Sequence, residues 1–497
     1  MRRWAWTAGV LGLAAGAPAS GQMLAESVLG DGVAEQYLVL GNPELELGHA
    51  LADRYWTGIA RGGRSLLRGG LDDFLSPALD AMDHRAAERM MRSFAADFFR
   101  AADPRTGLVP YSFDAESQLA GGRTGGRQPV DLVYKAALFL RWFPQDPEVR
   151  RGSAALAAAT LRAFDTPDGG VWAWASVRTG RGDLPGVHPV QFGQMAEGMH
   201  EVSRRTGDAR FGRWADAKLA WAWRQRAPGA AGLVCGYFTP RGRRDTDGGL
   251  CDTDVLYLTR RLFALHRLTG NPLYRQWALA NTDAWMAGGW GSAGHFVRRV
   301  RPDGARAADV LYGDGKYNTL WVLTAAYRET RDPRYVARLK QAWRTLRARG
   351  TGGLAPETVQ GARGGGRVDP QQTLFLAILV DAHQATGDAE LLRMARELGA
   401  AIRARGESVM RMEGGQAADA FLRLGLASVP MRRVEVELAS RSATADFEAG
   451  GRTATARGPR RVVVAYLPRA GSAVRVRGGA QIVSDRALPP VQATADQ

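Results

Sequence analysis

The segment LYGDGKYNTL gathers several side chains that can carry proton-transfer chemistry. Asp314, Lys316 and Tyr317 lie close together in it, flanked by Tyr312 and Asn318. A Gly-Asp-Gly turn followed by three polar side chains is poor core material, so we interpret this segment as functional. The structural alternative is that Asp314 only caps a helix and that the others pack. Lysine occurs four times in the chain, and its retention at 316 suggests proton exchange, which arginine performs poorly because of its very high pKa.

A second polar group stands in RQPVDLVYKAALF, at the start of another apolar run. Arg127 precedes the run, and Tyr134 and Lys135 lie near its beginning. A tyrosine again lies beside one of the scarce lysines. We expect these three residues to bind substrate, the alternative being that the tyrosine and the lysine simply pack.

A third segment, GVHPVQFGQMAEGMH, contains His188, Gln194, Glu197 and His200. Glu197 and His200 are one helical turn apart and can share a face, as can Gln194 and Glu197. A carboxylate in a buried helix needs a partner or a role, so Glu197 is a catalytic candidate, with His188 as a possible base and Gln194 as a substrate contact. A divalent metal held by Glu197 and the two histidines is possible, although this spacing is not a strong metal motif.

Clustered carboxylates mark a fourth segment, DTDGGLCDTDVLY, with Asp245, Asp247, Asp252 and Asp254. Such a cluster suits a hydrolase acid–base pair or Ca²⁺ ligands, but the ligand pattern of an EF-hand loop is missing. Solvated turn residues are the alternative. We assign Asp254, the one nearest the following apolar run, to substrate binding.

Aromatic and arginine side chains are dense in the connections between the apolar runs. Aromatic faces can stack on sugar rings, and forked guanidinium groups bind carboxylates in bidentate fashion. The alternative for the aromatics is packing within the loops, and a general arginine bias of the chain accounts for some of the arginines. The candidates for substrate binding are Trp172, Trp174, Tyr237 and Arg244, and the same connections also hold Tyr111, Trp290, Arg123, Arg178, Arg181, Arg241, Arg243, Arg298, Arg299, Arg363 and Arg367.

One short phrase recurs along the chain and reveals the elements that position these residues. It reads PQDPEV, TGDARF, TGNPLY, TRDPRY and TGDAEL, starting at residues 144, 206, 269, 330 and 386. A period of roughly 60 residues indicates a repeated supersecondary unit. Each phrase predicts a turn whose Asp or Asn caps the next helix, with Pro tolerated at the first helical position.

The helices on the two sides of each turn differ in pattern. The helix after the turn is amphipathic, as in DPRYVARLKQAWRTLRARG, and is expected to be an outer helix. The helix before the turn is apolar most of the way round, as in TLFLAILVDAHQ, and is expected to be a buried inner helix. Longer connections with short extended segments lead from each outer helix to the next inner one. Outer helices are expected near 85, 147, 208, 271, 332 and 388, and inner helices near 44, 130, 189, 253, 315, 370 and 416.

Over residues 44–428, this pattern resembles the six- and seven-hairpin toroids of many glycoside hydrolases, polysaccharide lyases and sugar epimerases. The resemblance implies an all-α (α/α)6 or (α/α)7 toroid, with the long loops gathered at the end where the inner helices begin. Helix N-termini carry partial positive charge, which favours anionic ligands there. An open α-solenoid is the alternative, but it does not explain the long polar loops on one side.

The two ends of the chain have other patterns. Arg2 and Arg3 precede a short apolar stretch and small residues, which predicts a signal peptide over residues 1–21 and an exported protein, secreted or periplasmic; an ordinary helix is the alternative. Residues 22–429 are assigned to the toroid. Alternation of apolar and polar residues predicts about four strands in a small β region over 430–483, followed by a loose tail over 484–497.

Composition constrains the partners. The chain has 66 basic and 50 acidic residues, a formal net charge of +16. An exported basic protein is expected to meet an acidic polysaccharide or an anionic envelope surface rather than nucleic acid, and no nucleic-acid module is recognisable. No segment is apolar enough for stable insertion into a membrane. Cys235 and Cys251 are the only cysteines, and either a disulfide bond between them or two thiols is compatible with the sequence.

Among activities, cleavage of a uronate-containing polysaccharide by β-elimination fits these features best. A lyase must neutralise the substrate carboxylate, remove the C5 proton and protonate the leaving oxygen. The candidates are Lys316 or His188 as base, Tyr317 or Tyr312 as acid, and Arg127 or Arg244 as the neutralising group.

Three other functions stay open. A glycoside hydrolase would pair Asp314 with Glu197, Asp252 or Asp254 across the scissile bond. An epimerase of the same fold would use His188 or His200 as bases. A non-catalytic polysaccharide-binding protein would need the aromatic and arginine side chains but not the polar clusters.

Overall fold

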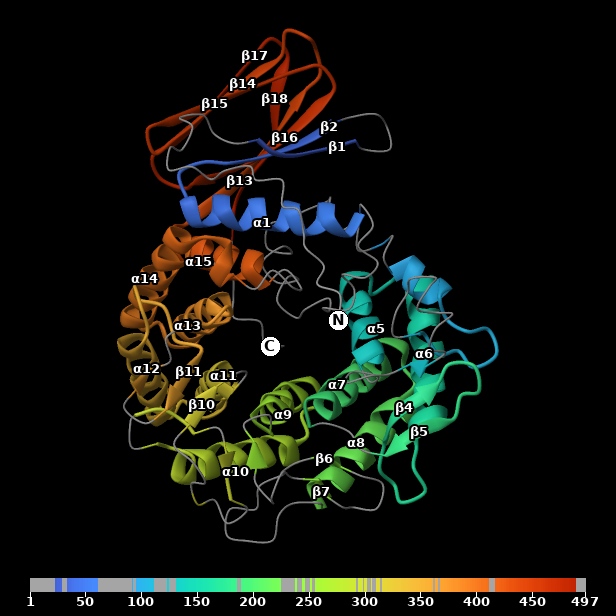
Figure 1. Cartoon of the computed structure of the whole chain (residues 1–497). Helices are drawn as coiled ribbons and strands as arrows, with labels where there is room; N and C mark the ends of the chain where they lie inside the picture. Colours follow the sequence, from blue (N-terminus) through green and yellow to red (C-terminus); the bar gives the residue numbers. More distant parts are fainter. Residues whose placement is uncertain are drawn as a thin grey trace, which may run out of the picture. The chain divides into compact units, whose positions relative to one another are not determined.

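The computed structural model of the chain divides into two units (Figure 1). The β unit comprises Met1–Glu46 and Val429–Leu488, and the helical unit comprises Leu47–Ser428 and Pro489–Gln497. The structure describes residues 23–28, 34–60, 92, 95–110, 123–124, 131–185, 189–224, 237–238, 244–245, 251–252, 255–291, 294–297, 299–301, 305, 310–312, 315–360, 363–364, 367–410 and 416–488. None of the described helices is long and apolar enough to cross a membrane.

Two layers of helices alternate along the helical unit. The inner helices contact one another in chain order, and each except the last packs on the outer helix that follows it (Figure 1). The inner helices are α5 (Asp131–Trp142), α7 (Pro189–Thr206), α9 (Val255–Thr269), α11 (Gly315–Thr330), α13 (Gln372–Thr386) and α15 (Gln416–Ser428). The outer helices are α6 (Pro147–Phe164), α8 (Ala209–Arg224), α10 (Pro272–Gly288), α12 (Pro333–Arg349) and α14 (Ala389–Arg405). Helix α1 (Pro43–Ala60) meets α15 where Gly48 lies against Leu422, and a short 3₁₀ helix, η3 (Glu407–Val409), follows α14.

The recurring phrase forms the short turn from inner to outer helix, as expected. Asp146, Asn271, Asp332 and Asp388 are N-caps whose side chains accept hydrogen bonds from backbone N–H groups of the first turn. In α6, α10 and α12 a proline follows the cap and fits the first helical turn because it has no N–H to satisfy. The inner helices therefore all run in the same direction and begin at the end opposite these turns.

Burial separates the two layers as the sequence pattern predicts. In α12 the buried side chains are Tyr335, Val336, Leu339, Ala342, Trp343 and Leu346, which form one face. In α13 every residue from Gln372 to Ala382 is buried, because the helix is covered on all sides. Burying a large apolar side chain stabilises a fold by about 1.5–3 kcal/mol, so these faces hold the layers together.

The long connections contain short strands, also as expected. They form small antiparallel sheets at the end where the inner helices begin. The strands are β3 (Arg123–Thr124), β4 (Trp172–Ser176), β5 (Gly182–Pro185), β6 (Tyr237–Phe238), β7 (Arg244–Asp245), β8 (Cys251–Asp252), β9 (Arg299–Val300), β10 (Val310–Tyr312), β11 (Thr358–Gln360) and β12 (Arg363–Gly364). Cys251, in β8, is disulfide-bonded, and Cys235 is the only other cysteine in the chain.

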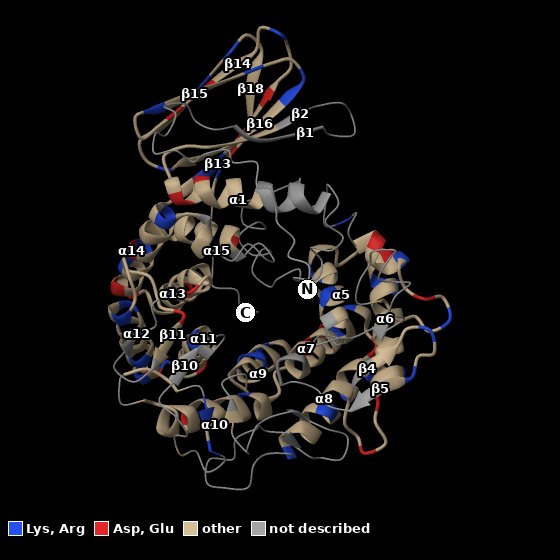
Figure 2. Cartoon of the chain, in the orientation of Figure 1, with Lys and Arg blue, Asp and Glu red and all other residues tan. Residues whose placement is uncertain are grey.

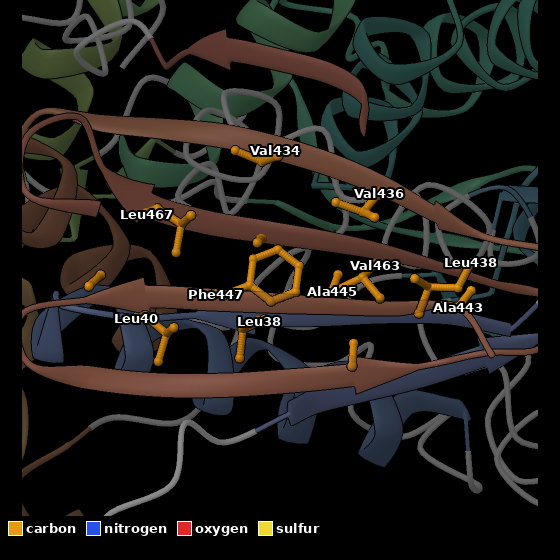
Figure 3. Packing of buried hydrophobic residues seen from close by; sticks show 13 residues of the cluster. Leu38, Leu40, Val434, Val436, Leu438, Ala443, Ala445, Phe447, Val463 and Leu467 are labelled. Carbon is orange, nitrogen blue, oxygen red and sulfur yellow. The ribbon is translucent and has the colours of Figure 1, made fainter. Parts of the chain in front are cut away.

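The β unit is a sandwich of two sheets around one core (Figure 3). A five-stranded sheet has the order β1-β2-β16-β13-β18, and a three-stranded sheet has the order β15-β14-β17. Phe447 from the smaller sheet packs with Val434, Val436 and Leu467 from the larger one. The strands are β1 (Met23–Val28), β2 (Ala34–Val39), β13 (Met431–Leu438), β14 (Thr444–Ala449), β15 (Arg452–Arg457), β16 (Arg461–Pro468), β17 (Ser472–Arg477) and β18 (Ala480–Ala487).

This sandwich differs from the expected domain boundaries at both ends. Strands β1 and β2 come from the stretch assigned to the toroid, yet β2 pairs in parallel with β16. The apolar side chains of Leu38 and Leu40 enter the sandwich core, which explains why the segment joins this unit. The last strand continues to Ala487, beyond the expected boundary at 483, because β18 pairs along the whole of β13. The expected signal peptide, residues 1–21, lies outside the described residues.

Two glycines let the inner helices around α7 approach closely. A side chain at Gly198 would lie 2.7 Å from the backbone nitrogen of Tyr134 in α5. On the other neighbour, a side chain at Gly193 would lie 2.7 Å from Cβ of Arg261 in α9. Both separations are far below an ordinary van der Waals contact. The glycines of α7 therefore lie where α5 and α9 pack most closely against it.

We predict that Gly198→Ala destabilises the helical unit, although alanine is the better helix former. The new methyl group would collide with helix backbone, which cannot rotate away, and overpacking of this kind costs about 1–3 kcal/mol. Gly399→Ala in α14 is the matched control, because its methyl group would meet mainly the end of the Leu424 side chain. Denaturant unfolding measures both, and an equal effect of the two changes would contradict the prediction.

Candidate active site on the inner helices

Glu197 lies at the centre of a buried ion cluster between three inner helices. One carboxylate oxygen accepts a hydrogen bond from Arg141 of α5 at 2.8 Å, and the other accepts one from Arg261 of α9 at 2.8 Å. Glu197 and Arg261 are each 1% exposed. A carboxylate between two guanidinium groups satisfies the requirement that a buried charge be paired, and it ties α5, α7 and α9 together.

The two arginines keep Glu197 ionised. Burial by itself would raise the pKa of Glu197, but the charges and hydrogen bonds of Arg261 and Arg141 outweigh it and hold this pKa below its ordinary value. A general acid needs the opposite shift, since it must carry a proton near neutral pH. The sequence predicts a catalytic carboxylate at Glu197; the geometry gives it the role of a positioning residue for the arginines.

Arg261 links this ion cluster to polar side chains nearer the beginning of the inner helices. Its Nη1 donates to the hydroxyl of Tyr134 at 3.0 Å, and its Nη2 donates to the hydroxyl of Tyr257 at 3.0 Å. The same Tyr257 oxygen accepts from Nε2 of Gln194 at 3.2 Å. Tyr257 and Gln194 are partly exposed, whereas Tyr134 and Arg261 are buried. We call Tyr134, Gln194, Glu197, Tyr257 and Arg261 the inner polar cluster.

Arg260 extends the positive charge from α9 to α11. Its guanidinium carbon lies 3.6 Å from the centre of the Trp321 ring and 5.1 Å from that of Tyr257. Cation–π contacts of this kind contribute about 0.5–2 kcal/mol when they are desolvated. Two consecutive buried arginines on α9 therefore lie beside the Tyr257 ring, and Arg261 also donates to its hydroxyl.

The sequence interpretation missed Tyr257, Arg260 and Arg261, although a signal for them was present. The run VLYLTRRLFAL is an apolar inner helix interrupted by two adjacent arginines. Arginine is almost never fully buried unless it is paired, so an Arg-Arg step in a buried helix indicates a partner on a neighbouring element. Glu197 and Tyr134, which the sequence did single out, are partners of Arg261, and Gln194 contacts Tyr257.

Lys316 has a different setting from the one its sequence context suggests. Its ammonium group forms an ion pair with Asp369 and donates to the backbone oxygens of Pro356, at 3.1 Å, and Glu357. The side chain is fully buried, and burial raises the pKa of Asp369 even though the ammonium group opposes that shift. The three N–H groups of the ammonium group have these three acceptors, so none of them faces a substrate. Lys316 therefore fixes the start of α11 to the segment 356–369, and we do not retain it as the base.

The other candidates divide into three groups. Tyr317 and Asn318 are buried at the start of α11, Lys135 is buried beside Tyr134 in α5, and Trp172 is partly exposed in β4. Trp174, Tyr237, Arg244 and Tyr312 have their backbone in strands β4, β6, β7 and β10, and their side chains are not described. Arg127, His188, Asp254 and Asp314 lie outside the described residues.

His200 does not join Glu197, as the possible metal site of these two residues with His188 would require. Its Nε2 lies 3.0 Å from the Asp216 carboxylate of α8, and Tyr274 of α10 donates to the same carboxylate. Burial, together with Asp216, raises the pKa of Tyr274. His200 therefore helps to join α7 to two outer helices, while Glu197 faces α5 and α9. Within the described part of the chain, no three His, Cys, Asp or Glu side chains are grouped as a metal site would require.

A second ion cluster joins α11, α13 and α15. Arg328 of α11 donates to Asp381 of α13 at 2.5 Å, and Nη1 of Arg423 of α15 lies 3.8 Å from the same carboxylate. Asp419 accepts from Nε of Arg423 at 2.8 Å, and its other oxygen has no hydrogen-bond partner among the described residues. Burial raises the pKa of Asp419 to about 7, against the effect of Arg423, and Asp381 adds to the rise. Asp419 thus keeps a proton up to nearly neutral pH.

Comparison with known proteins supports the architecture. No protein-family model and no curated sequence matches the chain. Solved structures do: an alpha-1,2-mannosidase from Trichoderma reesei has a TM-score of 0.56 at 14% identity, over 78% of this chain and 94% of that one. A cellobiose 2-epimerase from Spirochaeta thermophila has a TM-score of 0.51 at 14% identity, over 69% and 98% of the two chains. The cellobiose 2-epimerase from Bacillus thermoamylovorans has a TM-score of 0.52 at 11% identity, over 68% and 98%.

The chain is an (α/α) toroid. The expected fold class, helical hairpins with a small carboxyl-terminal β region, is confirmed. At such low identity the likeness concerns the fold, and one fold hosts many reactions. What this chain can catalyse therefore depends on the side chains of its own inner helices.

We predict that Glu197→Gln lowers the free energy of unfolding by about 3 kcal/mol, because Arg141 and Arg261 then lose a buried charge partner that Glu201, 3.9 Å from Nε of Arg141, replaces only in part. Glu397→Gln is the matched control: Glu397 also pairs with two arginines, Arg347 and Arg393, but at the surface, where the loss is about 1 kcal/mol or less. Urea titration of both variants measures the difference. Normal stability of Glu197→Gln would return this residue to the list of catalytic carboxylates.

We predict that Asp419 makes the toroid less stable as pH rises towards neutral. Between the unfolded pKa of about 4 and the folded pKa of about 7, the folded chain holds a proton that the unfolded chain has released. The contribution of Asp419 to stability is therefore fully present below about pH 4 and is lost as the pH rises through about 7. Asp419→Asn, which mimics the neutral form, should reduce this pH dependence and be more stable than the parent at about pH 8.

Chemical denaturation at a series of pH values measures this effect, with a difference of up to about 4 kcal/mol at alkaline pH. Asp485→Asn, which removes an exposed carboxyl group of the β unit, is the control. Identical pH slopes for the parent and Asp419→Asn would show that Asp419 is ionised throughout.

Proposed function

We propose that this toroid is a carbohydrate-active enzyme that cleaves a uronate-containing polysaccharide or oligosaccharide by β-elimination. The observation that carries the proposal is the hydroxyl of Tyr257, which accepts hydrogen bonds from both Arg261 and Gln194 near the start of the inner helices. The structures of similar fold include a mannosidase and sugar epimerases, which favours a saccharide as the substrate.

The proposed reaction uses Tyr257 for proton transfer. Two donors directed at one phenol oxygen stabilise negative charge on it, so this oxygen can accept the C5 proton of the uronate. As the C5–H bond breaks, a C4–C5 double bond forms and the bond from C4 to the glycosidic oxygen breaks. The same hydroxyl then returns the proton to the departing oxygen, so Tyr257 acts in turn as base and acid.

Positive charge on α9 would make the C5 proton more acidic. Arg260 and Arg261 are adjacent, and the N-termini of the parallel inner helices add partial positive charge at the same end. The substrate carboxylate is expected to lie over this charge, where its developing negative character is stabilised. Glu197 and Tyr134 act as positioning residues, since they contact Arg261 and hold its guanidinium plane.

The proposal includes export of the enzyme, as the amino-terminal pattern predicts. The disulfide bond of Cys251 supports it, because such bonds persist mainly in oxidising compartments. An acidic polysaccharide is then the expected partner of a chain with a net charge of +16.

A glycoside hydrolase is the second candidate, and Asp419 is the observation that favours it. A glycosidase acid must hold a proton at working pH, and burial gives Asp419 a raised pKa. Cleavage of neutral glycans with loss of turnover in Asp419→Asn would support the hydrolase. Ultraviolet absorbance of an unsaturated product released from polyuronates would support the lyase.

We predict that Tyr257→Phe lowers turnover on the preferred polyuronate about 100-fold or more, the usual size of a general acid–base contribution. The ring and its packing remain, so the melting temperature should change little. Tyr335→Phe is the matched control, because it also removes a hydroxyl that hydrogen-bonds, here to Asp283 between outer helices at 2.8 Å. Full turnover by Tyr257→Phe, measured as initial rate of unsaturated product, would exclude Tyr257 from the chemistry.

A further inference from the structure

Three turns of the β unit are joined at one end of the sandwich. They connect β13 to β14, β15 to β16 and β17 to β18. The hydroxyls of Ser440 and Ser442 donate to the backbone oxygen of Gly478 at 2.7 and 3.2 Å. A side chain at Gly458 would collide with the carbonyl of Ser440, and one at Gly478 with that of Ser442. This close packing gives the three turns one fixed arrangement.

Four exposed arginines lie on these turns and on the strand ends next to them. Arg457 of β15 and Arg477 of β17 both pair with Thr444 of β14, so the three residues form one row across the smaller sheet. This row faces away from the core, because the alternate residues of β14 are the ones that point inward. Arg441 lies in the first turn and Arg460 in the second. We call these four residues the arginine end.

The arginine end carries positive charge that no carboxylate neutralises. Among the described residues, none of the four forms an ion pair, whereas Arg452 pairs with Glu46 and Arg475 with Glu448 in the same unit. Over residues 429–488 the sequence has 11 arginines and 5 acidic residues, a difference of +6, and no lysine. Figure 2 shows how Lys and Arg colour the loops of this unit.

Backbone geometry also singles out this end. Arg460 has a φ of 49°, and Arg331 is the only other non-glycine residue in the described part with a positive φ. The left-handed region costs a residue with a Cβ roughly 1–2 kcal/mol relative to the right-handed one. Glycine would avoid this cost, so the turn keeps a charged side chain at a position that disfavours one.

We propose that the arginine end of the β unit is a binding site for an anionic polysaccharide chain, separate from the inner helices of the toroid. Guanidinium forks on a rigid support match carboxylate or sulfate groups in bidentate fashion, and the preorganised turns reduce the entropy lost on binding. The chain-like ligand would contact several of the four arginines at once. This site does not depend on the reaction proposed for the toroid.

Polysaccharide fits this surface better than the other polyanions. Nucleic-acid sites for single strands use exposed aromatic rings for stacking, and the described aromatic residues of the β unit, Tyr37, Phe447 and Tyr466, are all buried. Membrane-surface sites add apolar side chains that enter the interface. The exposed Ile482 and Val483 lie in the middle of β18, where Ile482 pairs with Val436, and not at the arginine end.

The test is retention of the full-length chain on immobilised polygalacturonate and heparin, with dextran as the neutral comparison. The parent should bind both anionic resins and elute with added salt, as screened charge pairs require. Arg457→Ser combined with Arg477→Ser should weaken binding roughly tenfold and lower the salt needed for elution. Turnover on short soluble oligosaccharides should remain, since neither residue belongs to the helical unit.

Arg405→Ser combined with Arg469→Ser is the matched control, because it removes the same charge from two exposed arginines outside the arginine end. Binding by this control equal to that of the parent supports a specific site. Equal losses in the two double variants would mean that only net charge matters and would overturn the proposal. Tighter binding to double-stranded DNA or to phosphatidylserine vesicles than to either polysaccharide would overturn it as well.

Discussion

The carboxylate of Glu197, shared by Arg141 and Arg261, is the interaction on which the proposed site depends. Inner helices of a toroid are apolar on nearly every side, and apolar packing alone does not fix how they are rotated about their axes. A buried ion pair does fix the rotation of the helices, because a buried charge left without its partner costs several kcal/mol. Once Glu197 sets the plane of Arg261, the hydroxyl of Tyr257 is set as well.

A buried ion cluster also joins the other inner helices, with a different balance of charge. Asp381 joins Arg328 and Arg423, but Asp419 adds a second carboxylate, so acids and bases are equal in number there. One carboxyl group then keeps its proton, whereas Glu197 with two arginines stays ionised. With Asp419 protonated, both clusters carry net positive charge; the first gains a further positive charge from Arg260, which lies beside Tyr257, and this makes it the better site for an anionic substrate.

The repeat was enough to predict the inner helices from 130 onward, the outer helices from 147 onward and the capped turns, because each depends on residues close in sequence. The outer helix expected near 85 lies outside the described residues. The β unit was only partly predictable, since the pairing of β2 with β16 joins segments that lie at opposite ends of the chain. The role of Lys316 also could not be predicted from the local sequence pattern. Its carboxylate partner, Asp369, lies in the sequence beyond the next outer helix. A polar turn before a helix indicates either a ligand site or a structural tether, and only the fold distinguishes them.

The choice between lysine and arginine follows from what each must contact. Lys316 and Lys218 each end among backbone carbonyls and one aspartate, Asp369 or Asp165, in a space that suits a small ammonium group with three donors. Arg261 instead reaches a carboxylate and two tyrosine hydroxyls that lie in different directions, which requires a fork. In a chain so rich in arginine, a buried lysine therefore indicates a compact tether, and a buried arginine indicates a branching contact. By that criterion Arg261, rather than Lys316, is the residue around which we propose that the chemistry of this toroid is organised.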